Sequence, residues 1–322
     1  MSDALAIDAG LPRRSSSRGS AVGRLFEGLC FAAATFLLVA LGGLMASLVI
    51  GGWPAIAKFG LGFLVSTTWN PVTDVYGAAG PIVGTLVTAT LALLLALPVA
   101  GGVAFFLTEL CPGPLRRPIG IAVELLAGVP SIVYGMWGLF FFAPLFSRWV
   151  ELPLMSSAKP GSLLETLTSG VPNGTGILAA SIILAMMILP FIAATLRELL
   201  LTVPPTVRES AYGLGATTQE VVLKVTLPYV RTGAIGAVML GLGRALGETM
   251  AVTFIIGNSH GFPKSLFDSG STIASTIANE FAEATTPMHT AALIYLGLVL
   301  FVMSFSVLGL ARLMLRRQMA RL

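Results

Sequence analysis

An arginine and a glutamate stand four residues apart in an otherwise apolar stretch, as Arg244 and Glu248. A charge buried in hydrocarbon costs about 2.5–3.5 kcal/mol even on the lenient insertion scale, so such residues usually face a cavity or a partner. In one continuous helix the two side chains would share a face, and a salt bridge that only holds helices together is one explanation. We favour a second explanation, in which an anion competes for the guanidinium, because its planar fork suits a tetrahedral oxyanion. The candidate site also includes the adjacent Thr249.

A second group of candidate path residues combines an acid with a helix break. Glu124 lies in another apolar stretch, where we expect it to be buried, and the sequence Val-Pro-Ser follows at 129–131. Proline interrupts helical hydrogen bonding, so this break frees backbone groups, and Ser131 adds a hydroxyl. Irregular backbone at that depth in a bilayer is expected to line a cavity. A kink without any ligand explains the break equally well. Pro190 predicts a second kink in another apolar stretch, and a kink without a ligand is an equally good explanation there.

The clearest motif lies in the polar connection 197–232, with the spacing Glu-Ser-Ala, three residues, Gly, nine residues, Val-x-Leu-Pro. We expect Thr206 to cap a short amphipathic helix and Gly215 to end it. An apolar stripe on such a helix would lay it along the membrane surface. An interfacial helix without a partner also fits this pattern. The expected stripe comprises Val207, Ala211 and Leu214, and the motif residues are Glu209, Ser210, Ala211, Gly215, Val225, Leu227 and Pro228.

Long apolar blocks must position these residues. Of the 322 residues, 55% are hydrophobic and 11% are charged, against about 45–50% and about 25% in soluble domains. About twenty apolar residues in a helix cross a hydrocarbon core of ~30 Å, so the sequence indicates an all-α integral membrane protein rather than a soluble fold. We predict six transmembrane helices, at residues 27–50, 82–108, 119–146, 175–196, 233–257 and 291–315.

The distribution of basic residues predicts the orientation of these helices. Residues 1–24 are a polar, arginine-rich tail that we expect to be disordered. Fourteen of the 19 Lys and Arg residues fall in this tail, in the connections 109–118 and 197–232, and at the C-terminus. Four fall in the opposite connections. Lys and Arg concentrate in cytoplasmic loops, so both termini are predicted to be cytoplasmic. The opposite connections, 51–81, 147–174 and 258–290, are long enough to dock an external partner.

Several kinds of chemistry are not indicated. The cytoplasmic arginines explain the formal charge of +4, so this charge does not predict nucleic-acid binding. Cys30 and Cys111 support no disulfide framework, and His260 and His289 lack the spacing of a metal site. No Gly-x4-Gly-Lys-Ser/Thr sequence occurs, so ATP would have to be bound by another subunit. The apolar stretches contain no group of nucleophilic or metal-binding residues, so the sequence does not indicate a membrane-embedded enzyme.

The motif at 209–228 closely resembles the signature loop of ABC importer permeases, Glu-Ala-Ala-x3-Gly-x9-Ile-x-Leu-Pro, with serine and valine as two mild departures. In that family the loop helix inserts into a cleft of the ATPase. The resemblance therefore implies that Glu209 forms a polar anchor there and that the small Ala211 and Gly215 allow close approach. It also implies the type I ABC importer permease fold, with this helix as the cytoplasmic coupling helix.

Three stretches closely resemble the phosphate-specific transport permeases of the PstC type, namely 128–135, 188–192 and 243–252. The resemblance extends over about residues 80 to 315. It implies that the tail is followed by a first transmembrane helix with its outer connection at 25–80 and by a permease core at 81–318. It places Arg244 and Glu248 on the translocation path of a bacterial inner-membrane protein.

The same resemblance implies the partners of the chain. These are a second permease of the PstA type, two ATPase subunits of the PstB type, an external phosphate-binding protein of the PstS type, and the lipid bilayer. ATP and Mg²⁺ would be bound by the ATPase, so neither a cofactor nor catalysis is expected in this chain. Phosphate would be released inward after hydrolysis, by alternating access.

Other functions stay open on the sequence alone. The nearest is the same architecture with another oxyanion, such as sulfate or molybdate, which uptake assays would distinguish. An ion-coupled carrier or channel belongs to a different class and should show paired broken helices in two related halves, a repeat that this sequence does not display. Co-purification with an ATPase would separate that class from an importer subunit.

Overall fold

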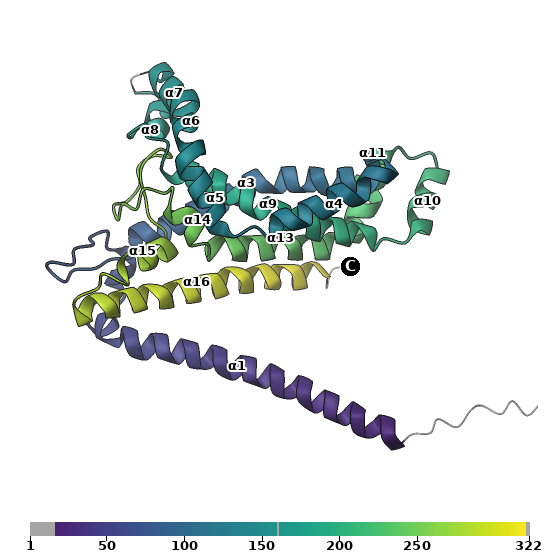
Figure 1. Ribbon diagram of the computed structural model, residues 1–322, viewed down its shortest axis with the longest axis horizontal. Helices are drawn as coiled ribbons and strands as arrows, with labels where there is room; N and C mark the ends of the chain where they lie inside the picture. The colour runs from purple at the N-terminus through teal and green to yellow at the C-terminus, as the bar shows by residue number, and fades with distance from the viewer. Residues whose placement is uncertain (1–16, 160, 320–322) are drawn as a thin grey trace, which may run out of the picture. The chain divides into compact units, whose positions relative to one another are not determined.

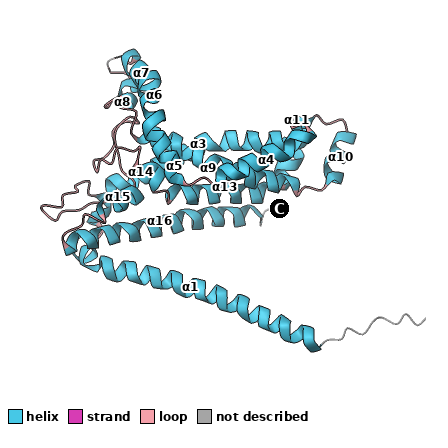
Figure 2. Ribbon diagram, viewed as in Figure 1, coloured by secondary structure: helices cyan, strands magenta, loops and turns pink. Residues whose placement is uncertain are grey.

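The computed structural model describes residues 17–159 and 161–319, and all the regular elements in these ranges are helices (Figures 1 and 2). This confirms the predicted all-α fold. The chain separates into two units, Met1–Ile50 and Gly51–Leu322. Residues 1–16 of the predicted tail lie outside the described residues.

The first unit contains most of α1, a helix that runs from Ser17 to Phe59. Its stretch Val22–Phe59 is apolar and long enough to cross a membrane, as predicted for the first span. Because α1 begins at Ser17, the last residues of the predicted tail are helical. Once a helix exists, each added residue gains one backbone hydrogen bond, so an apolar span extends readily into its flank.

Three helices of the second unit can cross a membrane without a bend, and they confirm the predicted second, fourth and sixth spans. They are α3 (Ala79–Phe105), which continues as the π-helical turn η1 (Phe106–Leu110), α9 (Ile177–Leu201) and α16 (Pro287–Met319). α9 continues through Pro190 without ending there.

Two further spans are bent pairs of helices. α4 (Gly113–Ala127) meets the helical segment Ser131–Ser157 at 86°. The bend lies at the Val-Pro-Ser sequence, so the break expected there is confirmed. A second pair joins Thr218–Tyr229 to α13 (Arg231–Leu246) at 77°. When each pair is counted as one span, the described chain has the predicted six.

The predicted fifth span at 233–257 is wrong in its extent. α13 ends at Leu246, and only the four-residue α14 (Met250–Thr253) follows. The 16 residues of α13 extend about 24 Å at 1.5 Å per residue, which is short of a ~30 Å hydrocarbon core. Hydropathy merges the two pieces because only three residues separate them.

Short elements complete the second unit. The 131–157 segment consists of α5 (Ser131–Trp137), η2 (Gly138–Phe142), α6 (Ala143–Phe146), η3 (Ser147–Glu151) and α7 (Leu152–Ser157). The 218–229 segment consists of α11 (Thr218–Glu220), η4 (Val221–Thr226) and α12 (Leu227–Tyr229). The others are α2 (Gly62–Val65), α8 (Leu163–Thr168), α10 (Pro205–Gly213) and α15 (Ile273–Glu280). Figure 1 shows α10 and α11 at one end of this unit, with α6, α7, α8 and α15 toward the other.

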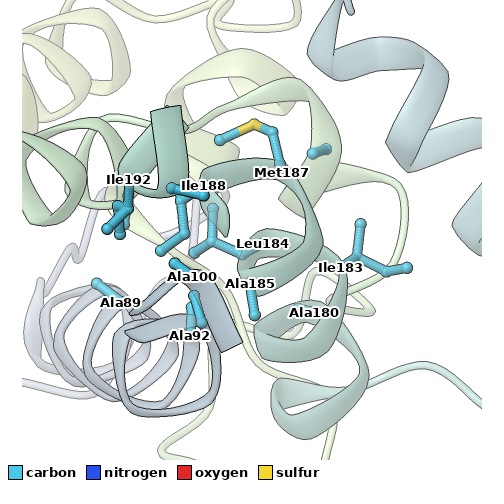
Figure 3. Packing of buried hydrophobic residues seen from close by; sticks show 14 of the residues in the cluster. Ala89, Ala92, Ala100, Ala180, Ile183, Leu184, Ala185, Met187, Ile188 and Ile192 are labelled. Atoms are coloured by element: carbon cyan, nitrogen blue, oxygen red, sulfur yellow. The ribbon is translucent and has the colours of Figure 1, made fainter. Parts of the chain in front are cut away.

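The centre of the second unit is the interface between α3 and α9, where small side chains face large ones (Figure 3). Helices in a bilayer associate through close van der Waals contact, because lipid tails are as apolar as leucine. A stripe of alanines at three- to four-residue spacing allows this contact. On α3 the stripe is Ala89, Ala92, Ala96, Ala100 and Ala104, and α9 presents Leu184, Ile188 and Ile192 to the same core.

The connection 258–290 lies directly on α3. A Cβ atom at Gly84 would lie 2.0 Å from the carbonyl oxygen of Ser271, so only glycine fits there. The backbone N–H of Ile273 also donates a hydrogen bond to Thr85 Oγ1, at 2.9 Å. This connection is therefore fixed to the bundle at its contact with α3.

Candidate functional site

Arg244 lies in the last turn of α13, which ends at Leu246 with Gly247 as its C-terminal cap residue. A cation in this position is stabilised by the partial negative charge of the helix C-terminus. The guanidinium carbon lies 5.6 Å from the centroid of the Phe191 ring on α9. Arg244 also lies close enough to the Tyr134 hydroxyl on α5 to act on it electrostatically. Three elements therefore meet around one half-buried guanidinium.

Glu248 does not share a helix face with Arg244, so that expectation is wrong. The helix ends between the two residues, and Glu248 Oε1 instead accepts a hydrogen bond from the backbone N–H of Ala251, at 3.2 Å. Thr249 stands at the start of α14, and its hydroxyl donates to the Gly247 carbonyl oxygen at 3.4 Å. Among the described residues, no carboxylate forms an ion pair with Arg244. Its charge is therefore not neutralised by an acid in the described chain.

The bend after α4 lies beside this break. A Cβ atom at Gly135 of α5 would lie 3.0 Å from both the Ala251 Cα and the Met250 carbonyl oxygen, so α5 and α14 are in close contact. Ser131 begins α5 at a half-buried position. The Tyr134 hydroxyl donates to the carbonyl oxygen of Leu126 at 3.1 Å and so satisfies a backbone group freed by the bend. The structure thus places Ser131 and Thr249 on adjoining elements.

Glu124 is not buried within the described chain, contrary to expectation. Its side chain is 52% exposed and pairs with Arg197 of α9, at 2.8 Å between Oε1 and Nη1. α4 packs against α9, and most residues of α4 are exposed. Sequence reasoning assigned Arg197 to a polar connection and missed this pair, because α9 extends to Leu201.

The motif helix forms as α10 (Pro205–Gly213), but its start and its stripe differ from the prediction. Pro204 is the N-terminal cap residue, so Thr206 lies inside the first turn. Pro205 occupies the first helical position, where proline is preorganised for a helix start. Val207 packs against the core and Ala211 is buried, whereas Leu214 is 89% exposed and leaves the stripe.

Gly215 ends the helix as predicted. It adopts a positive φ of 85°, a conformation that favours glycine. The Gly215 N–H donates to the Tyr212 carbonyl oxygen at 2.9 Å, and the Ala216 N–H donates to the Ala211 carbonyl oxygen at 3.2 Å. These two bonds are the paired bonds of a Schellman motif. The turn after α10 is therefore set by the spacing of the motif itself.

Motif residues gather around a hollow beside α10 with a volume of about 390 Å³. Glu209 and Ser210 are exposed, and Ser210 Oγ donates to the Thr206 carbonyl oxygen at 2.7 Å. Leu227 and Pro228 lie in α12, just before the 77° bend. The hollow is lined by Ala211, Leu214, Gly215, Ala216, Glu220, Lys224 and Val225. The structure thus brings together part of a motif that spans twenty residues.

Both histidines meet on one carboxylate at the opposite end of the unit. Glu280 Oε1 lies 2.6 Å from His260 Nε2, and Oε2 lies 2.8 Å from His289 Nε2 and 2.6 Å from Trp69 Nε1. The rings of Trp69 and His260 stack at 5.4 Å, and those of Tyr76 and His289 at 5.3 Å. We call these five residues the outer cluster, after the connections that the sequence predicts to face outward. No sequence spacing pointed to it, because its members come from three separate segments.

The Glu280 carboxylate is held in its charged form by the outer cluster. Burial alone would raise its pKa, but the hydrogen bonds from His260, His289 and Trp69 outweigh burial, so the pKa of Glu280 lies below its usual value of 4.5. Within the described residues, no group of three His, Cys, Asp or Glu side chains has the arrangement of a metal site. The outer cluster is therefore a hydrogen-bonded junction between the 51–81 and 258–290 connections and the start of α16.

Known proteins resemble the chain over most of its length. The family of binding-protein-dependent transport system inner membrane components matches residues 100–319. The chain is 51% identical over 322 residues to the Phosphate transport system permease protein PstC of Mesorhizobium japonicum, covering 98% of each chain. It is 53% identical over 287 residues to the protein of the same name from Haemophilus influenzae, covering 89% of this chain and 90% of the relative.

A solved structure resembles the fold. A bacterial alginate ABC transporter, in complex with an alginate pentasaccharide-bound periplasmic protein, superposes with a TM-score of 0.60. The match covers 91% of this chain and 94% of that chain at 16% sequence identity. At this identity the likeness concerns the fold alone.

Proposed function

Because the chain belongs to the PstC phosphate permeases, within the family of binding-protein-dependent transport system inner membrane components, we propose that it is a transmembrane subunit of an ATP-driven phosphate importer. It would form the translocation path together with a second permease of the PstA type. Two ATPase subunits of the PstB type would bind ATP and Mg²⁺, and a PstS-type protein would deliver phosphate. In this assignment the chain itself catalyses no covalent step.

The observation that carries the proposal is the half-buried guanidinium of Arg244, with no paired carboxylate in the described chain. A charge at this depth is costly unless something compensates it. A phosphate oxyanion matches the planar donor fork of arginine and supplies that compensation. Ser131, Thr249 and the freed backbone at the two breaks lie on adjoining elements and would offer uncharged hydrogen bonds. Had Arg244 been bound to Glu248, a structural salt bridge would have been the simpler account.

The orientation of the chain follows from its basic residues. We place both termini and α10 on the cytoplasmic side of the bacterial inner membrane, because this orientation makes the segments that contain fourteen of the 19 Lys and Arg residues cytoplasmic. The outer cluster would then face the binding protein. Glu209 and the hollow beside α10 would receive the ATPase, and closure of the ATPase dimer would move α10 and switch access from outside to inside.

The alternatives find no support beyond the sequence. Sulfate or molybdate would need the same arginine, but both of the PstC relatives described above carry phosphate in their names. An ion-coupled carrier would have no use for an ATPase-docking motif. Phosphate and an ATPase partner remain the most economical assignment.

The test of this proposal is substitution of Arg244 by glutamine in the assembly reconstituted into vesicles. Hydrogen bonds to charged groups contribute about 1.5–3 kcal/mol, so ATP-driven phosphate uptake should fall about ten-fold or more. Arg117→Gln removes an exposed arginine from the first turns of α4 and serves as the matched control, with uptake close to that of the unsubstituted assembly. Equal uptake by Arg244→Gln and the control would refute the role of Arg244.

A further inference from the structure

A largely buried ion pair joins α10 to the transmembrane helices. Arg208 of α10 and Glu109 of η1 lie 3.0 Å apart, between Nη1 and Oε1. The side chain of Glu109 is only 9% exposed and that of Arg208 17%, so water screens the pair weakly. Arg208 Nη2 also donates a hydrogen bond to the carbonyl oxygen of Leu200 in α9. One side chain therefore ties α10 to two helices.

This arrangement depends on the shape of the guanidinium. Its two terminal nitrogens lie in one fixed plane, so Nη1 can face the Glu109 carboxylate while Nη2 donates to the Leu200 carbonyl oxygen. A lysine ammonium is a compact point charge on a flexible stem and would not hold both acceptors in one geometry. Arg208 is therefore a three-way connection between α10, α9 and the end of the span formed by α3 and η1.

The pair also restricts how α10 can move. Separating a buried pair leaves an uncompensated charge in a poorly hydrated place, which is far more costly than keeping the pair together. A displacement of α10 is thus cheapest when η1 and the end of α9 move with it. The α3–α9 core would carry that displacement onward, and Phe191 of α9 lies beneath the Arg244 guanidinium.

Arg208 directly precedes the motif residue Glu209. Successive residues on a helix point about 100° apart, and here Glu209 is exposed while Arg208 reaches into the bundle. One turn of α10 thus has an outward face for a partner and an inward face fixed to the spans.

We propose that Arg208 and Glu109 are the positioning residues through which movement of α10 is passed to α3 and α9. This inference rests on the proposed function, since it takes α10 as the element that the ATPase moves. The two residues touch neither phosphate nor ATP in this account. They determine how much of the ATPase movement reaches the transport path.

The test measures coupling in the assembly reconstituted with permease partner, ATPase and binding protein. Glu109→Gln and Arg208→Lys should each lower the phosphate imported per ATP hydrolysed by at least about five-fold, the lower end of ordinary coupling energies. ATPase should still co-purify, and its hydrolysis should respond less to the loaded binding protein. Glu198→Gln removes an exposed carboxylate near the end of α9 and is the matched control, with an unchanged ratio.

A merely structural role gives a different result. It would reduce the quantity of assembled complex but leave the imported phosphate per ATP unchanged, and that outcome would overturn the inference. If Glu109→Gln does not assemble, Arg208→Lys decides, because it keeps both charges and loses only the fork. If the unsubstituted assembly imported no phosphate, the proposed function would fail, and the response of ATP hydrolysis to the binding protein would still test the coupling role.

Discussion

At the scale of single residues, the availability of Arg244 depends on where α13 ends. In a continuous helix Glu248 would lie one turn from the guanidinium and neutralise it. Because α13 ends at Leu246, Glu248 lies at the N-terminus of α14 instead. The sequence identified Arg244 because a charge in an apolar block is conspicuous, but it did not reveal the break, since Gly-Glu-Thr contains no proline. The outer cluster escaped prediction for a different reason, because only the fold brings Trp69 and Glu280 together.

The outer cluster gives a prediction at this scale, concerning Glu280. A carboxylate whose pKa is lowered by folding stabilises the folded state above pH 4.5, and this contribution is lost as the pH falls through the lowered value. Glu280→Gln leaves buried donors poorly satisfied, so we expect a loss of about 1–3 kcal/mol at pH 7. Thermal unfolding of the detergent-solubilised protein should show this loss shrinking below pH 4.5.

Glu283→Gln is the control for this measurement, because Glu283 is exposed on the same connection. Its midpoint of thermal unfolding should stay near that of the unsubstituted protein at every pH. A Glu280→Gln effect of equal size at pH 7 and at pH 3 would mean that the charge of Glu280 is not what stabilises the outer cluster.

At the scale of elements, hydropathy located all six apolar blocks because each span must hide its backbone in lipid. It could not define the two bends in the same way, since a window of about twenty residues averages over breaks of three residues and of one residue. Pro130 marked one of them, because proline cannot continue the hydrogen-bond ladder. Pro228 lies two residues before the bend that precedes α13, whereas the end of α13 carries no such mark and appears only in the structure.

The alanine stripe of α3 supports a prediction about this interface. Ala96 is fully buried in the core shared with α9, and leucine there would overpack a close helix contact at a cost of about 1–3 kcal/mol. We expect a lower midpoint of thermal unfolding for Ala96→Leu. Ala122→Leu makes the same change at an exposed position of α4 and should have little effect. Equal midpoints for the two variants would argue against tight packing of α3 on α9.

At the scale of the whole molecule, the second unit has two differentiated ends. One carries α10 with its exposed motif face, and the other carries α15 with the outer cluster (Figure 1). An importer subunit requires this division, because a binding protein and an ATPase act on opposite sides of one membrane. The motif spacing allowed the α10 end to be recognised from sequence. The other end has no repeating pattern, and its arrangement follows from long-range contacts such as Gly84 with Ser271.

The most direct test of the central claim is ion uptake by vesicles that contain the complete assembly. We predict accumulation of inorganic phosphate that requires ATP on the ATPase side and loaded binding protein on the other, with no accumulation of sulfate or molybdate. Phosphate accumulation that continued without ATP, or import of sulfate in preference to phosphate, would contradict the assignment of this chain as a subunit of an ATP-driven phosphate importer.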